Sequence, residues 1–186
     1  MNISAAAWTV LARDGLSDLS VRKVAAEVGL PPSSLRYLFP TQASLREQVI
    51  DLVLDRVKDR TDAIAGPGGD AAWARTALLE VLPLDEIRIT EMEVYLALGT
   101  AAMTDPALRD GHQRVHQAIR GVCARAARAV LGPEAAPVEV ERLHALVDGL
   151  ALHLVRDPSR ADGQWAVEVL DAHLASLSGS AGSRRA

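Results

Sequence analysis

The sequence predicts an all-α protein of about nine helices without a β-strand. Hydrophobic residues make up 49% of the chain but aromatic residues only 3%, so the apolar mass is mostly Ala, Leu and Val, which favours packed helices over a β-sandwich. Apolar residues recur with helical period, and Gly, Pro and capping residues separate the periodic segments. At 186 residues the chain is long enough for one domain or two small ones, each with a core.

The first three helices are short and sharply separated. Apolar spacing predicts a helix over Ile3–Arg13, and Gly15 ends it. Ser20 is a good N-cap for the second helix, which Gly29 terminates. The prolines that follow are suited to a helix start, where a missing N–H costs nothing, so the third helix is expected at Pro32–Leu38.

Longer helices follow, separated by the glycine-rich stretches Gly66–Gly69 and Gly132–Pro137. Their expected ranges are Gln42–Ile64 capped by Thr41, Asp70–Leu82, Asp85–Met103, Thr104–Leu131, Val138–Val155 and Arg160–Leu177. The composition of the tail, Ser178–Ala186, predicts disorder.

Residues 20–39 fit a helix-turn-helix, with a head at 1–46 and a larger domain at 47–177. Ala25 is small enough for a close helix crossing, and Gly29 can adopt a positive φ in the turn. The apolar anchors are expected to be Val24, Val28, Leu30, Leu35 and Leu38. The exposed side of the third helix then suits a major groove. Residues 1–46 hold five basic and three acidic side chains, a net +2 in a chain of −4, which favours nucleic acid over the alternative of an ordinary helical hairpin.

The stretch Ala5–Ile50, "AAAWTVLARDGLSDLSVRKVAAEVGLPPSSLRYLFPTQASLREQVI", closely resembles the DNA-binding domain of the TetR family of transcriptional regulators. "ALVDGLALHLV" at Ala145–Val155 resembles the subset whose effector domain is like that of the choline-responsive betaine regulators. The resemblance implies a homodimeric regulator, usually a repressor, that binds a palindromic operator in double-stranded DNA and is released by a small-molecule effector.

Carried over by position, the resemblance gives a set of DNA contacts. Ser20 and Arg22 are expected at phosphates, the third helix in the groove, and Tyr37 and Thr41 at the backbone. The groove residues are Pro32, Ser33, Ser34 and Arg36. Two departures stand out: Gln42 replaces a common phosphate-binding lysine, and Arg36 stands where tyrosine is frequent.

The larger domain is expected to hold the effector and the dimer face. Candidate walls of the effector pocket are Trp73, Met92, Tyr95, Met103 and His116, whose alternative role is to fill the core. Two apolar stripes on the last two helices predict the dimer interface, or packing inside one chain, through Leu146, Val147, Leu150, Leu154, Trp165, Leu170 and Leu174.

Other classes find little support in the sequence. His112, His116 and Cys123 share a helical face, which suits a metal site or a polar pocket lining, and no metal or cofactor is expected. "ERLH" at Glu141–His144 matches half of a di-iron bundle motif, but no second copy exists, so an oxidoreductase is a poor alternative to a regulator. A helical ligand-binding dimer without DNA affinity stays open. No secretory signal or membrane span is visible, so a cytoplasmic protein is expected. No phosphate loop or nucleophile motif appears, so the protein is not expected to be an enzyme.

Overall fold

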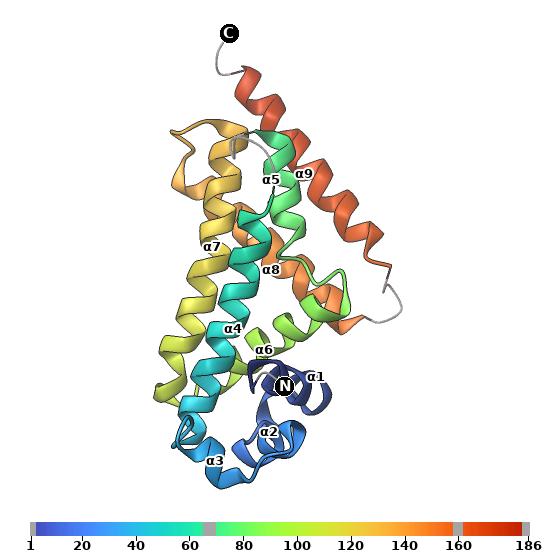
Figure 1. Cartoon of the computed structure of the whole chain (residues 1–186). Coiled ribbons are helices and arrows are strands. Elements are labelled where there is room, and N and C mark those ends of the chain that lie inside the picture. Colours follow the sequence, from blue (N-terminus) through green and yellow to red (C-terminus); the bar gives the residue numbers. More distant parts are fainter. Residues whose placement is uncertain (1–2, 65–69, 158–161, 184–186) are drawn as a thin grey trace. The chain divides into compact units, whose positions relative to one another are not determined.

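The structure, a computed structural model, describes residues 3–64, 70–157 and 162–183, and this part of the chain is helical without a strand, as predicted (Figure 1). Two compact units form: Met1–Arg56 with Glu93–Val115, and Val57–Met92 with His116–Ala186. The boundaries fall inside three continuous helices, α4 (Gln42–Asp62), α6 (Glu86–Ala102) and α7 (Arg109–Leu131). The division at residue 46 concerns function and stays a prediction.

The first unit contains α1 (Ile3–Asp18), α2 (Val21–Val28) and α3 (Pro32–Arg36), drawn in blue in Figure 1. Gly15 breaks α1 with φ 77° and ψ 171°, at the position where the sequence predicts the helix to end. A 3-10 turn over Pro106–Leu108 precedes α7. The core of the first three helices is apolar and includes Val10, Leu19, Val24, Ala25, Leu35 and Phe39.

Two of the predicted apolar anchors are wrong. Leu30 is 44% exposed and Leu38 is 51% exposed. Because α3 ends at Arg36, the chain closes a further turn in which the Phe39 N–H donates to the Leu35 carbonyl at 2.8 Å. Phe39 therefore lies on the face of Leu35 and is buried in place of Leu38.

The start of α4 is fixed by a reciprocal cap. The Ser44 N–H donates to Thr41 Oγ1 at 3.0 Å, and the Thr41 N–H donates to Ser44 Oγ at 3.2 Å. Further along, the guanidinium of Arg56 lies 4.0 Å from the ring centroid of Trp8 in α1. These contacts hold α4 against the first helices of its unit.

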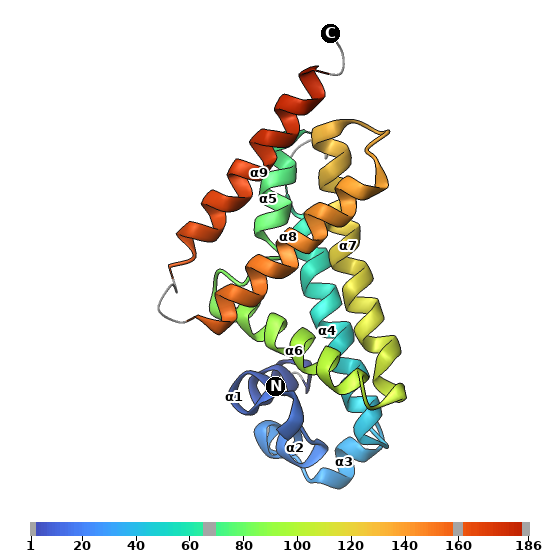
Figure 2. The same cartoon turned by 180° about the vertical axis from the view of Figure 1, so that it is seen from behind.

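The second unit contains α5 (Ala71–Leu79), α8 (Pro137–Arg156) and α9 (Gln164–Ser183), and α9 packs against both of the others (Figure 2). Asp70, the predicted start of this helix, is the N-cap of α5 and accepts from the Trp73 N–H at 2.7 Å. Helix α9 continues to Ser183, into the segment for which the sequence predicts disorder, and that disorder stays a prediction.

Some expected features lie outside the described residues: Gly66–Gly69, the helix start at Arg160, and the last three residues of the tail. Within the described chain, no helix combines the length and apolar character needed to cross a membrane.

Candidate nucleic-acid interface and ligand-binding residues

The corner between α2 and α3 depends on one glycine. Gly29 has φ 71° and ψ 28°, the left-handed conformation that a side chain disfavours. Its N–H donates to the Ala26 carbonyl at 3.1 Å, and the Leu30 N–H donates to the Ala25 carbonyl at 2.9 Å, which together end α2 in a Schellman motif. Pro31 and Pro32 then start α3, the role predicted for them.

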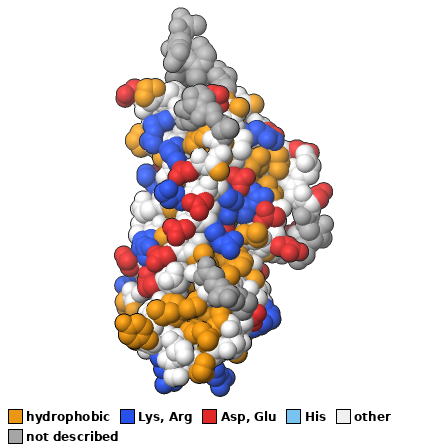
Figure 3. Space-filling model, viewed as in Figure 1, with side chains coloured by type: hydrophobic (Ala, Val, Ile, Leu, Met, Phe, Trp, Pro, Cys, Tyr) orange, Lys and Arg blue, Asp and Glu red, His pale blue; other side chains and the backbone are white. Residues whose placement is uncertain are grey.

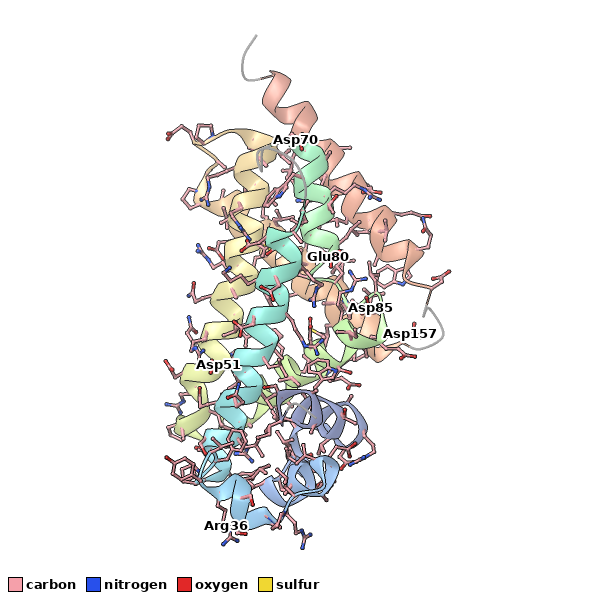
Figure 4. All side chains as sticks on the ribbon, viewed as in Figure 1. Arg36, Asp51, Asp70, Glu80, Asp85 and Asp157 are labelled. Atoms are coloured by element: carbon pink, nitrogen blue, oxygen red, sulfur yellow. The ribbon has the colours of Figure 1, made fainter. Side chains whose placement is uncertain are left out.

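The outward side of α3 carries the residues that the sequence nominates for the groove. All four are exposed, and Arg36 extends away from the helix in Figure 4. Tyr37 is 89% exposed, beside them. Figure 3 shows basic side chains at the end of the first unit where α2 and α3 lie. This surface presents hydroxyl groups and a cation, which are suited to base edges and phosphates.

Ser20 and Thr41 have a structural task as well. Ser20 Oγ accepts from the Lys23 N–H at 3.3 Å as the N-cap of α2, and Thr41 caps α4. A hydroxyl that accepts a capping bond still has its own proton to donate. Both residues can therefore cap a helix and contact a phosphate.

The basic residues of the head divide into two groups. Arg13 lies 2.9 Å from Glu27 and 3.0 Å from Asp14, and Lys23 Nζ lies 2.9 Å from Asp14. Hydrogen bonds from Arg13 and then Lys23 lower the pKa of Asp14 to about 2. These cations hold the helices together, which the count of charges in the sequence could not reveal.

Arg22 and Arg36 form the second group, both exposed. No ion pair joins either guanidinium to an acidic side chain within the described residues. Gln42, where the family often has lysine, donates from its side-chain amide to the Leu19 carbonyl. Its amide thus secures the loop before α2.

The residues predicted for an effector pocket are divided between the units. Trp73 and Met92 are 7% and 8% exposed in the second unit, which also contains His116. Tyr95 belongs to the first unit, where its ring stacks on His112 with centroids 5.1 Å apart. Met103 is 80% exposed, which does not favour it as the wall of an enclosed pocket.

Most residues predicted for the dimer face are buried inside one chain. Among the seven, Leu146 and Trp165 are half-buried. The other five, at most 9% exposed, are Val147, Leu150, Leu154, Leu170 and Leu174. The apolar stripes therefore pack α5, α8 and α9 together, as the alternative interpretation held.

The histidines group differently from the sequence prediction. His116 of α7 lies near His144 and Asp148 of α8, with a ligand atom from each residue within 4.8 Å of the others. Cys123 is fully buried, and burial raises the pKa of its thiol to about 12. Sequence reasoning missed His144 and Asp148 as a pair, although their spacing of four residues places them on one helical face.

Glu141, the first residue of the half di-iron motif, has another partner. Its carboxylate accepts from Arg120 Nε at 3.0 Å, and hydrogen bonding to Arg120 lowers the pKa of Glu141. Glu141 therefore forms a surface salt bridge with Arg120 rather than half of a di-iron site.

Comparisons with known proteins agree on one family. Residues 70–179 match the family described as "BetI-type transcriptional repressor, C-terminal". The HTH-type transcriptional regulator PksA of Bacillus subtilis (strain 168) is 34% identical over 179 residues, covering 94% of this chain and 87% of PksA.

Solved structures extend the match. A transcriptional regulator from Rhodococcus sp. Rha1 has a TM-score of 0.77 and 26% identity, covering 94% of this chain and 93% of its own. The multidrug binding protein EbrR complexed with ethidium has a TM-score of 0.68 and 27% identity, covering 92% and 95%. The regulators of this fold are not enzymes, so the oxidoreductase alternative is excluded. The chain belongs to the TetR family of transcriptional regulators, in its BetI-type branch.

Proposed function

We propose that this regulator is a repressor that binds a palindromic operator as a homodimer and is released by a small-molecule effector. The observation that carries the proposal is the exposed side of α3, which holds Ser33, Ser34 and Arg36 outward from a corner fixed by Gly29. A short helix of this kind enters the major groove with its polar side toward the bases. Ser20 and Arg22 are the proposed phosphate contacts, Tyr37 and Thr41 the proposed backbone contacts. Pro32 is proposed to face the groove.

The proposed dimer uses the outward side of α8 and α9. Because the inner stripes are already buried in one chain, the partner has to cover exposed apolar residues. Val169 of α9 is 41% exposed and is the best candidate. Val169→Arg would place a charge in the interface without entering the core of the chain. We expect the variant to sediment as a monomer and to keep its helix content by circular dichroism. A dimeric variant would contradict this choice of face.

The effector is proposed to bind in the second unit, against Trp73, Met92 and His116. Trp73 and Met92 offer buried apolar and polarizable surface, and His116 adds a polar group. Since EbrR is complexed with ethidium, a flat lipophilic cation is a reasonable first probe. Trp73→Leu should weaken ethidium binding, whereas Trp8→Leu, in the first unit, should leave it unchanged.

Helices α4 and α7 are the proposed route from effector to DNA. Each is continuous and has residues in both units. In the first unit they are clamped together: Arg114 of α7 donates to Glu47 of α4 at 2.9 Å and also to Asp51. A Cβ on Gly111 would lie 2.5 Å from Ile50 Cδ1, so the helices are also in close contact there. A movement of α7 would therefore be transmitted to α4.

The experiment is a selection of duplexes from a random pool by the purified protein, followed by release of the best duplex with lipophilic cations. The proposal predicts an enriched inverted repeat whose affinity falls about 5–150-fold with an effector. If no inverted repeat is enriched but a ligand still binds, the better interpretation is a helical ligand-binding protein without DNA affinity.

A further inference from the structure

The strongest unassigned feature of the molecule is the cluster of His116, His144 and Asp148 in the second unit. It combines residues from two helices, α7 and α8, with one potential ligand atom from each residue. His144 and Asp148 are one helical turn apart, and the rings of His116 and His144 lie with centroids 4.7 Å apart. Two imidazoles and a carboxylate on facing helices form a set of donors used by divalent metal ions.

The distances are close to those of a coordination sphere. His144 Nε2 lies 3.6 Å from Asp148 Oδ2, and all three ligand atoms lie within 4.8 Å. Bonds of about 2.0–2.1 Å in a tetrahedral zinc site place neighbouring donors about 3.4 Å apart. The His144–Asp148 pair is therefore already near this spacing, and the ligand atom of His116 lies within 4.8 Å of both.

A second, independent observation points to a ligand at the same place. His144 is 4% exposed, and its Nε2 is buried without a hydrogen-bond partner in the described part of the chain. A buried polar nitrogen left in this state destabilises a protein, so such atoms are rare unless something binds them. The orphaned atom is the one that faces the carboxylate of Asp148.

The types of ligand atom in the cluster indicate which metal ions it would prefer. Glu141 is paired with Arg120, and Asp148 is the carboxylate that lies beside His144. Imidazole donors favour first-row transition metals, whereas Ca²⁺ and Mg²⁺ prefer oxygen ligands throughout. Three protein ligands would leave a further coordination position open, as in metal sites that exchange a bound water.

We propose that His116, His144 and Asp148 bind a divalent first-row transition-metal ion, with Zn²⁺ as the reference case. The site goes beyond the proposed release by a lipophilic effector and does not depend on DNA binding. An ion there would join α7 to α8 at His116, two residues along α7 from the clamp residue Arg114.

The test titrates Co²⁺ and Zn²⁺ into metal-free, untagged full-length protein in the absence of DNA. We expect one Co²⁺ per chain with the visible absorption bands of a four- or five-coordinate ion, displaced by Zn²⁺. His116→Ala and Asp148→Asn, both at partly exposed positions, should each weaken Zn²⁺ binding by at least the roughly 10–100-fold that loss of an outer-shell partner costs.

The matched control is His153→Ala, an exposed histidine on the same helix, which should bind as the wild type does. Circular dichroism with a chelator checks that each variant folds. Absence of a Co²⁺ spectrum, or equal affinity in all variants, would overturn the proposal. Operator affinity is measured separately, so a regulator without a metal site and a metal-binding protein without DNA affinity give different results.

Discussion

The two units keep their polar groups in different places. In the described chain, the buried polar or charged side chains are Thr61, Thr90, Glu91 and His144, and all belong to the second unit. The first unit has an apolar core and holds Arg22 and Arg36 at its surface. The first unit's proposed contact with DNA requires polar groups at the surface, whereas the ligand binding proposed for the second unit requires some inside.

The stability of the second unit depends on a buried ion pair. Arg60 donates to both carboxylate oxygens of Glu91, at 2.8 and 2.5 Å, and Glu91 is 6% exposed. Burying such a pair is tolerated only while both partners are present. The comparison therefore predicts that removing a charge has different consequences in the two units. It should lower the stability when the charge is in the second unit and the DNA affinity when it is on the exposed surface of the first.

The largest expected effect follows from Glu91→Ala. It leaves the guanidinium of Arg60 partly buried, which should cost about 3–5 kcal/mol of unfolding free energy, toward the lower figure because Glu80 remains 3.2 Å away. Lys58→Ala, on the same helix as Arg60, removes an exposed pair with Asp62 and should cost about 0.5 kcal/mol or less of unfolding free energy. Urea unfolding measures both, and equal costs would contradict the contrast.

The corner of the head provides the next test. Gly29→Ala meets no neighbouring atom within 4 Å, so its cost is the left-handed backbone alone, about 1–2 kcal/mol. Gly121→Ala, within helix α7 and equally unobstructed, should instead stabilise by about 0.5–1 kcal/mol. Thermal unfolding should show a lower melting temperature for Gly29→Ala and a higher one for Gly121→Ala. A Gly29→Ala variant as stable as the wild type would show that the corner is not conformationally strained.

The sequence predicted the local elements well because their signals are local. Ser20, Gly29 and Asp70 cap or end helices as expected, since each acts through its own backbone or hydroxyl group. The side on which an apolar residue lies depends on the whole fold, so Leu38 was misassigned, and the sequence left two roles open for the buried Leu150. Periodicity marks an apolar stripe but not whether a partner helix lies in the same chain or in another.

The candidate sites also differ in whether they depend on local sequence or on the packing of distant helices. The exposed residues of α3 could be predicted, because they follow from a short motif and its turn. The group formed by His116, His144 and Asp148 could not, since it depends on how α7 and α8 face each other.

The smallest expected effect concerns coupling between the units. Arg114→Ala removes the clamp between α7 and α4 and should reduce the effect of the releasing ligand on operator affinity by about 0.5–2 kcal/mol. Arg142→Ala, which removes an exposed pair with Glu139 on α8, should leave the coupling unchanged. Ligand titrations at fixed operator concentration measure the difference, and an unaltered response in Arg114→Ala would exclude this route.

The central claim is that the head reads DNA through α3, and Arg36→Ala tests it most directly. Binding of the selected inverted repeat and of a scrambled duplex should be measured for wild type, Arg36→Ala and Arg13→Ala, whose guanidinium is occupied by Asp14 and Glu27. The account predicts a loss of about 5–150-fold on the operator for Arg36→Ala, little change on the scrambled duplex, and little change on either for Arg13→Ala. Equal affinity of wild type and Arg36→Ala for the operator would contradict it.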